Sequence, residues 1–221
     1  MCRLIFMWQV QLMNQDYKTV AREACDEFTE KRSRFIGYVK PVKTEEEAMA
    51  FIRRIRSEHW DARHNVYAYS LREGNVKRYS DDGEPSGTAG MPVLDVIVKN
   101  DVYDVCVVVT RYFGGILLGT GGLTRAYSQG SKIALAAGKI VLMQSCLLCE
   151  VTCDYNRYGK VSALVSEYGG VVDDTLFEAD VCLKFHIPPA SLTQLNKRLA
   201  DATAGSVQAV SDAEGYFMTE S

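Results

Sequence analysis

Several signatures that would assign this 221-residue chain to a well-known class are missing from it. Residues 1–12 are apolar but too short for a membrane span and lack a signal-peptide cleavage pattern, and no other segment could cross a membrane. We expect residues 1–12 to be a leader artefact or a frayed end, because Met13 is a more natural first residue for the protein. Neither the Gly-Lys-Ser/Thr of a P-loop nor the Gly-x-Ser-x-Gly of a serine hydrolase occurs. The sequence therefore favours neither nucleotide hydrolysis nor serine-hydrolase chemistry.

The chain also lacks an even, regularly spaced set of cysteines. Its seven cysteines are scattered, which argues against a disulfide framework and favours a reducing, cytoplasmic location. Cys146, Cys149 and Cys153 have a spacing that suggests a zinc or iron–sulfur site, but residues 147–154 alternate as a strand. Cys149 and Cys153 then share one face as small core residues, whereas Cys146 points the other way. We expect no metal here, and no cofactor elsewhere in the chain.

The net charge is small, and its distribution is more informative than its total of −3. Residues 1–140 contain 20 basic and 17 acidic residues, whereas residues 141–221 contain 5 and 11. The two parts carry +3 and −6, so we expect any polyanionic partner to contact the N-terminal part. A hydrophobic content of 47% with 24% charged residues is typical of a globular protein with one large domain or two small ones.

The most informative segment that is present is the glycine-rich run at residues 111–125, RYFGGILLGTGGLTR. It follows an apolar strand pattern at 105–109 and precedes a helical pattern at 123–137. Backbone N–H groups in such a turn can approach an anion closely, and the dipole of the following helix favours negative charge. The alternative is that the glycines only allow a tight turn. The run does not complete a dinucleotide-binding fingerprint, because the third glycine is missing.

We therefore predict a phosphate- or nucleic-acid-binding site around this turn, with no catalytic residues. Two aromatic residues next to the first arginine could stack on bases or pack into the core. An arginine and a histidine at a helix-to-strand junction could contact phosphate or a base, although a lone histidine is more often structural. The predicted binding residues are Arg63, His64, Arg111, Tyr112, Phe113, Gly114, Gly115, Gly119, Gly121, Gly122 and Arg125.

A second unusual segment, at residues 80–90, is a loop rich in glycine and carboxylates. Asp81, Asp82 and Glu84 could bind a hard cation or act as acid and base groups, although their spacing does not fit an EF-hand. The alternative is structural: these acids pair with Arg111 or Arg125 and hold the loop against the glycine-rich turn.

Strand and helix signals predict an α+β protein of two layered domains, at residues 13–140 and 141–221. In the first domain we expect strands at 35–39, 65–71, 76–79 and 105–109, helices from Thr44 and over 123–137, and a loop over 80–92. The second domain has the order strand, helix, strand, strand, helix, strand, which is the ferredoxin-like βαββαβ arrangement. Its expected elements are 147–154, 158–168, 171–177, 180–187, 188–204 and 206–210.

Four motifs together resemble the YigZ/IMPACT family, and they lie at residues 34–37, 64–69, 80–90 and 108–123. The resemblance covers about residues 20–135, and residues after about 140 are similar to the small C-terminal domain of bacterial members. It implies an N-terminal domain with the left-handed βαβ fold of the second domain of a small-subunit ribosomal protein. It also implies a C-terminal ferredoxin-like domain similar to the last domain of elongation factor G.

Eukaryotic members of that family are translation regulators that compete for the activator of an amino-acid-starvation kinase, and nucleic-acid binding has been inferred for bacterial members from their fold. The chain lacks the eukaryotic N-terminal recruitment domain, so the kinase role is not carried over. It also has Met91 where many relatives have a basic or polar residue.

The leading hypothesis is a non-enzymatic cytoplasmic protein that binds RNA or a ribosome-associated factor and has no membrane partner. One alternative is an enzyme that acts on a phosphorylated small molecule, with Asp81, Asp82 and Glu84 as metal or acid/base groups. Another is a protein–protein adaptor that uses the acidic sheet face of the second domain.

Overall fold

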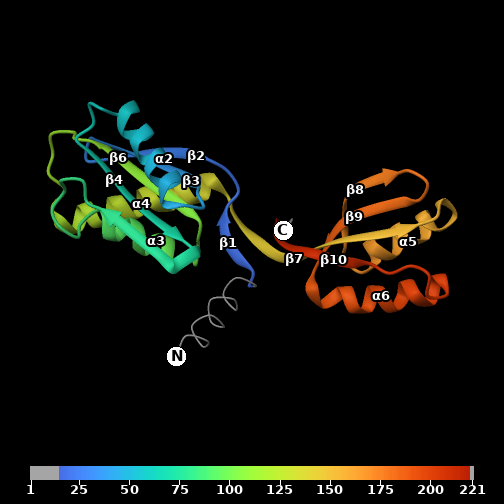
Figure 1. The fold of residues 1–221 in the computed structure, drawn as a ribbon. Coiled ribbons are helices and arrows are strands. Elements are labelled where there is room, and N and C mark those ends of the chain that lie inside the picture. Colours follow the sequence, from blue (N-terminus) through green and yellow to red (C-terminus); the bar gives the residue numbers. More distant parts are fainter. Residues whose placement is uncertain (1–14, 220–221) are drawn as a thin grey trace. The chain divides into compact units, whose positions relative to one another are not determined.

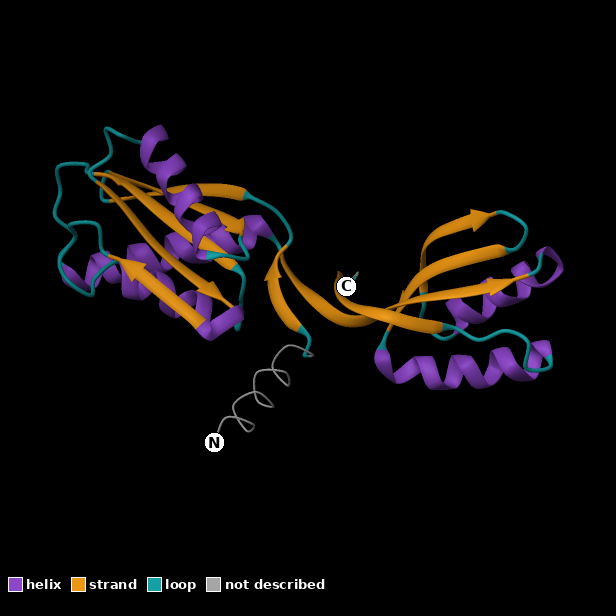
Figure 2. Ribbon diagram, viewed as in Figure 1, coloured by secondary structure: helices purple, strands orange, loops and turns teal. Residues whose placement is uncertain are grey.

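The computed structural model describes residues 15–219, which form two compact units (Figure 1). The first unit spans Tyr17–Leu142, and the second begins at Met143. Each unit consists of one antiparallel sheet with helices packed on it (Figure 2). Among the helices of this described part, none combines the length and the apolar character needed to cross a membrane. The prediction for residues 1–12 lies outside the described residues.

The first unit is built on a five-stranded sheet with the strand order β2-β3-β6-β4-β5, in which all neighbours are antiparallel. Its strands are β2 (Ala24–Glu30), β3 (Ser33–Pro41), β4 (His64–Leu71), β5 (Val76–Ser80) and β6 (Val105–Tyr112). A short strand, β1 (Tyr17–Val20), precedes them, and the short 3-10 helix η1 (Glu73–Asn75) connects β4 to β5.

Helices cover both faces of this sheet. On one face lies α2 (Glu45–Glu58), which begins as predicted at Thr44, whose hydroxyl accepts the Glu47 N–H. On the other face lie α3 (Gly90–Lys99) and α4 (Thr120–Gly138). The central strand β6 is therefore buried on both sides, and its unbroken apolar run has no polar face to present. Val105, Val107 and Val109 pack with α3 and α4, and Cys106 and Val108 pack with α2.

The two crossover connections of this sheet have opposite hands. The connection β3-α2-β4 and the connection β5-α3-β6 each join parallel strands with one strand between them. When one face of the sheet is viewed with the connected strands pointing upward, both connections lead to a strand on the same side. The helices of the two connections, α2 and α3, nevertheless lie on opposite faces of the sheet. One of the two is therefore left-handed, against the strong general preference for right-handed crossovers. This arrangement confirms the left-handed βαβ unit that the resemblance implied.

The strands of the second unit have the predicted ferredoxin-like arrangement, in which β9 pairs with β7 and β8, and β10 pairs with β7. The short strand β1 is the fifth strand of this sheet and also pairs with β7. Both helices pack on the same face of the sheet, through a cluster that includes Val161, Leu195 and Leu199. Cys149 and Cys153 are buried in this cluster, as the strand alternation predicted. The elements are β7 (Ile140–Cys153), α5 (Tyr155–Glu167), β8 (Val171–Phe177), β9 (Val181–Ile187), α6 (Pro189–Thr203) and β10 (Val210–Met218).

Two sequence predictions of secondary structure were wrong. The expected loop at 80–92 ends early, because α3 begins at Gly90 and tolerates Pro92 in its first turn, where no intrahelical N–H partner is required. The last strand does not run over 206–210 but over Val210–Met218. Residues before it are held by α6 instead: the Asn196 side chain donates to the Ala209 carbonyl and accepts the Ala209 N–H.

Glycines allow α4 to lie unusually close to the sheet. A Cβ atom at Gly37 of β3 would come within 2.2 Å of the Gly130 carbonyl oxygen on α4. We expect Gly37→Ala to destabilise the protein by about 3 kcal/mol, because backbone must move to admit the methyl group. Gly121→Ala, in the first turn of α4, has room and should stabilise by about 0.5 kcal/mol. Urea denaturation of both variants tests this, and equal effects would contradict the close approach.

Candidate functional site

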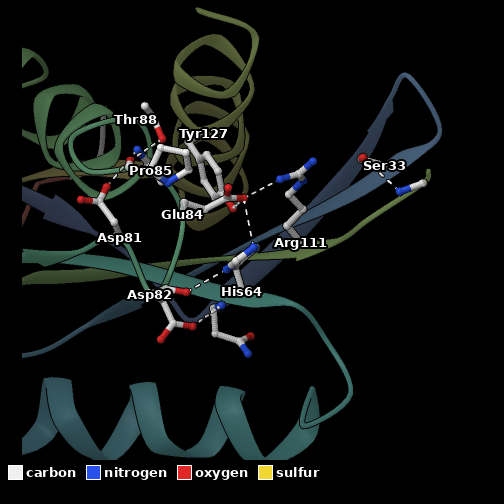
Figure 3. A network of polar contacts seen from close by, with 12 residues as sticks. Ser33, His64, Asp81, Asp82, Glu84, Pro85, Thr88, Arg111 and Tyr127 are labelled. Carbon is white, nitrogen blue, oxygen red and sulfur yellow. Dashed lines mark hydrogen bonds and ion pairs between the residues drawn. The ribbon is translucent and has the colours of Figure 1, made fainter. Parts of the chain in front are cut away.

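A buried ion pair lies at the end of β6 (Figure 3). The Arg111 guanidinium donates to Oε1 of Glu84 over 2.6 Å, and the Tyr127 hydroxyl of α4 donates to the same oxygen over 2.8 Å. The Arg111 and Glu84 side chains are only 6% and 4% exposed. Burial and the adjacent Glu84 carboxylate both raise the pKa of Tyr127, so its hydroxyl remains a donor. One carboxylate thus joins the acidic loop to a strand and a helix.

His64 and Asp82 extend this network across the sheet. His64 lies directly opposite Arg111 in the β4–β6 register, and its Nε2 is 3.7 Å from Oε1 of Glu84. Its Nδ1 is 2.8 Å from the Asp82 carbonyl oxygen, which can only accept, so the proton belongs on Nδ1. The Asp82 carboxylate accepts from Arg56 and from the Asn65 N–H, both over 2.6 Å.

Asp81 has a separate structural role at the start of α3. One of its carboxylate oxygens accepts the N–H groups of Ala89 and Gly90, and the other accepts the N–H of Gly87. These are donors that a helix start leaves without intrahelical partners. All three acids of the loop are therefore bound to protein donors. Within residues 15–219, no group of three or more His, Cys, Asp and Glu side chains is arranged to hold a metal ion.

The glycine-rich turn itself projects into solvent. Gly115 and Gly119 have φ values of 82° and 73°, a region that favours glycine, and a Cβ at either would meet open space. Gly119 precedes α4 without capping it through a side chain, and the first turn of α4 contains no acidic residue. Gly121 and Gly122 lie in that turn, and the exposed Arg125 follows in the next. The start of α4 thus leaves backbone N–H groups available beside a cation.

The glycine-rich turn contacts a basic hairpin turn formed by Lys31 and Arg32. Gly114 packs so closely that a Cβ there would lie 2.0 Å from the Arg32 carbonyl, and its N–H donates to the Ser33 hydroxyl. Lys31 and Arg32 are the two exposed residues between β2 and β3, and both have positive φ, at 44° and 66°. Asn and Gly are the residues that such a turn favours. A strained backbone here therefore presents two positive charges to solvent.

Of the other residues predicted for the site, one is half-buried and two are exposed. Tyr112 is half-buried, and its hydroxyl bonds to His59 and to Asp61. Phe113 is 46% exposed, and the Arg111 guanidinium lies 5.5 Å from its ring centre. Arg63 is exposed, and its N–H donates to the Arg111 carbonyl.

The structure brings together residues that are far apart in the sequence. Arg111, His64 and Glu84 meet at one point, in agreement with the interpretation that the acidic loop pairs with Arg111. Sequence reasoning missed Tyr127, although a tyrosine on the apolar face of a helix requires a partner for its hydroxyl. It did not place Lys31 and Arg32 at the site. It also missed Trp60, which is 83% exposed in the loop before β4.

Comparison with known proteins agrees with this architecture. Residues 31–135 match the Impact N-terminal domain, and residues 151–206 match a domain of unknown function, DUF1949. The chain is 35% identical to the IMPACT family member YvyE of Bacillus subtilis, over 87% of this chain and 89% of that protein. It is 37% identical to the IMPACT family member YigZ of Escherichia coli, over 80% and 89%. The chain belongs to the IMPACT family.

A solved structure and a eukaryotic protein are also similar to the chain. A protein described as "Crystal structure of an hypothetical protein" is 33% identical, with a TM-score of 0.58 over 90% of this chain and 98% of that one. The IMPACT homolog of Dictyostelium discoideum matches 41% of this chain but only 27% of its own length. The site described above lies within the part that carries the Impact N-terminal match.

The buried pair gives a direct test of its structural role. We expect Glu84→Gln to destabilise the IMPACT-family protein by about 3 kcal/mol, because it leaves the Arg111 charge buried without its partner. Tyr127→Phe, which removes one hydrogen bond, should cost about 1 kcal/mol. Adding Arg111→Met to Glu84→Gln should recover part of the loss, and this is measurable by urea denaturation. A double variant as unstable as the sum of its single variants would show that the two side chains do not interact.

Proposed function

We propose that the protein binds RNA phosphates on the surface formed by the glycine-rich turn 113–122, the hairpin turn Lys31–Arg32 and Arg125. The observation that carries the proposal is the contact between Gly114 and the strained, basic hairpin turn. Strain in a backbone persists where the surrounding structure or the function requires it. Here the strained residues supply cations next to a turn whose glycine N–H groups and helix dipole also favour anions.

The arginine best placed to bind phosphate is not Arg111. Its guanidinium is buried and already pairs with Glu84, so its contribution is to hold the loop, the strand and α4 together. Lys31, Arg32 and Arg125 are exposed, form no ion pair with a carboxylate within residues 15–219, and can contact a phosphate directly. Phe113 and Trp60 are exposed aromatics that can stack on unpaired bases, a mode that tolerates any sequence.

Translation regulation is the role that we infer for such binding, since part of this chain is similar to eukaryotic IMPACT homologues. A cytoplasmic location and a ribosome-associated target are consistent with that inference. The proposal does not require catalysis. The enzyme alternative has less support, because Asp81 and Asp82 use both carboxylate oxygens to bind protein donors.

The hairpin turn offers a test in which stability and binding move in opposite directions. We expect Lys31→Asn combined with Arg32→Gly to raise the free energy of unfolding by about 1 kcal/mol, because Asn-Gly suits this turn. The same change should weaken binding to a fluorescein-labelled single-stranded RNA, measured by anisotropy over a salt series. Loss of two phosphate contacts should reduce the slope of log K against log salt by about 1.4.

A matched control lies at the opposite end of the same sheet. Lys43 and Lys99 are exposed; Lys43 follows β3, Lys99 is the last residue of α3, and both elements run away from the glycine-rich turn. Lys43→Ala with Lys99→Ala removes the same charge and should leave both affinity and salt slope within twofold of the wild type. RNA binding that is weakened equally by both pairs, or that does not depend on salt, contradicts the proposed site.

A further inference from the structure

The sheet of the second unit has one face that no described helix covers. Both α5 and α6 pack on the other face, where Val151, Leu183 and Phe185 are buried against them. The uncovered face is hollowed by an open groove of about 340 Å³. Side chains from four of the strands line this groove, including Leu148 of β7, Lys184 of β9 and Phe217 of β10.

Carboxylates dominate the charge of the groove. Glu150, Asp173, Asp174 and Asp212 line it, with Lys184 as its single lysine or arginine. Glu150 and Asp174 flank Lys184 on the two neighbouring strands, and Lys184 pairs with Glu150 over 3.2 Å. Because Glu150 pairs with Lys184, the other three acids of the groove have no further lysine or arginine there to balance their charge. The lysine, arginine, aspartate and glutamate side chains of the groove thus carry a net −3, half of the −6 of residues 141–221, on a face that suits a positively charged partner.

A stacked ring pair borders these carboxylates. The rings of His186 and Phe217 are parallel within 5°, with their centres 3.6 Å apart. Both carboxylate oxygens of Asp173 lie within 3.0 Å of Nδ1 of His186. The Phe217 ring also packs against Gly215, where a Cβ would come within 3.1 Å of it. The ring therefore folds back over the sheet, beside the acids.

We propose that this face binds an arginine- and lysine-rich segment of a partner protein. A guanidinium group can stack on an aromatic ring and pair with a carboxylate at the same time, and the groove offers both within one surface. The charge of the groove repels nucleic acid, so the partner is a basic peptide and not RNA. This inference concerns the second unit and does not rest on the RNA site of the first.

The test uses the full-length chain and a fluorescein-labelled oligoarginine peptide, with an oligoglutamate peptide of equal length for comparison. We expect anisotropy to show binding of oligoarginine only. Asp174→Asn with Asp212→Asn should weaken that binding about tenfold at low salt. The control pair, Glu167→Gln with Asp201→Asn, removes two exposed carboxylates from α5 and α6 and should change the affinity less than twofold.

A further variant separates recognition from net charge. Phe217→Leu leaves the charge unchanged and should weaken oligoarginine binding about threefold, because it removes the ring from the groove. Lys31→Asn with Arg32→Gly should leave peptide binding intact, which distinguishes this site from the RNA site. Equal weakening by the two acidic pairs, full affinity in Phe217→Leu, or a labelled RNA that competes for the groove would each overturn the proposal.

Discussion

One buried carboxylate fixes the geometry of the first domain at the end where its candidate site lies. Glu84 accepts from Arg111 of β6 and from Tyr127 of α4, and it belongs to the loop that Asp81 anchors to the start of α3. Burying opposite charges is costly, and close geometry with additional hydrogen bonds must offset that cost. The loop, the strand end and the helix can therefore not move independently. The glycine-rich turn between Arg111 and Thr120 is exposed, yet it is held at both of its ends.

The position of Tyr127 depends on how closely α4 approaches the sheet. Gly37 and Gly130 remove side chains from the contact, and Phe35 meets the Tyr127 ring edge-on at 5.4 Å between centres. A larger residue at either glycine would push α4 outward and carry the tyrosine hydroxyl away from Glu84. The close contact between α4 and the sheet and the buried hydrogen bonds of Glu84 therefore depend on each other. The same constraint explains why a glycine at 114 lies against the hairpin turn: strand β6 and hairpin β2–β3 meet there without space for a side chain.

Local patterns in the sequence predicted most of this fold but only part of the site. The α2 stripe, its Thr44 cap and the alternation around Cys149 and Cys153 depend on neighbouring residues, so they were visible in the sequence. The start of α3 was not, because its capping carboxylate is Asp81, which lies nine residues before Gly90. The partner of Glu84 could be narrowed to an arginine, but the register that places His64 opposite Arg111 is a property of the folded sheet. The basic hairpin turn could not be predicted, because Lys-Arg is an unfavourable sequence for a turn in which both residues have positive φ.

The two proposed surfaces recognise opposite charges and lie on separate units. The first offers backbone N–H groups and three exposed cations to a polyanion, and the second offers carboxylates and stacked rings to a polycation. Within a single surface these features would neutralise each other, and each would weaken the recognition of the other's ligand. The two proposals together give the chain one site for a polyanion and one site for a polycation. The net charge of −3 does not reveal this difference, because it is the sum of +3 on residues 1–140 and −6 on residues 141–221.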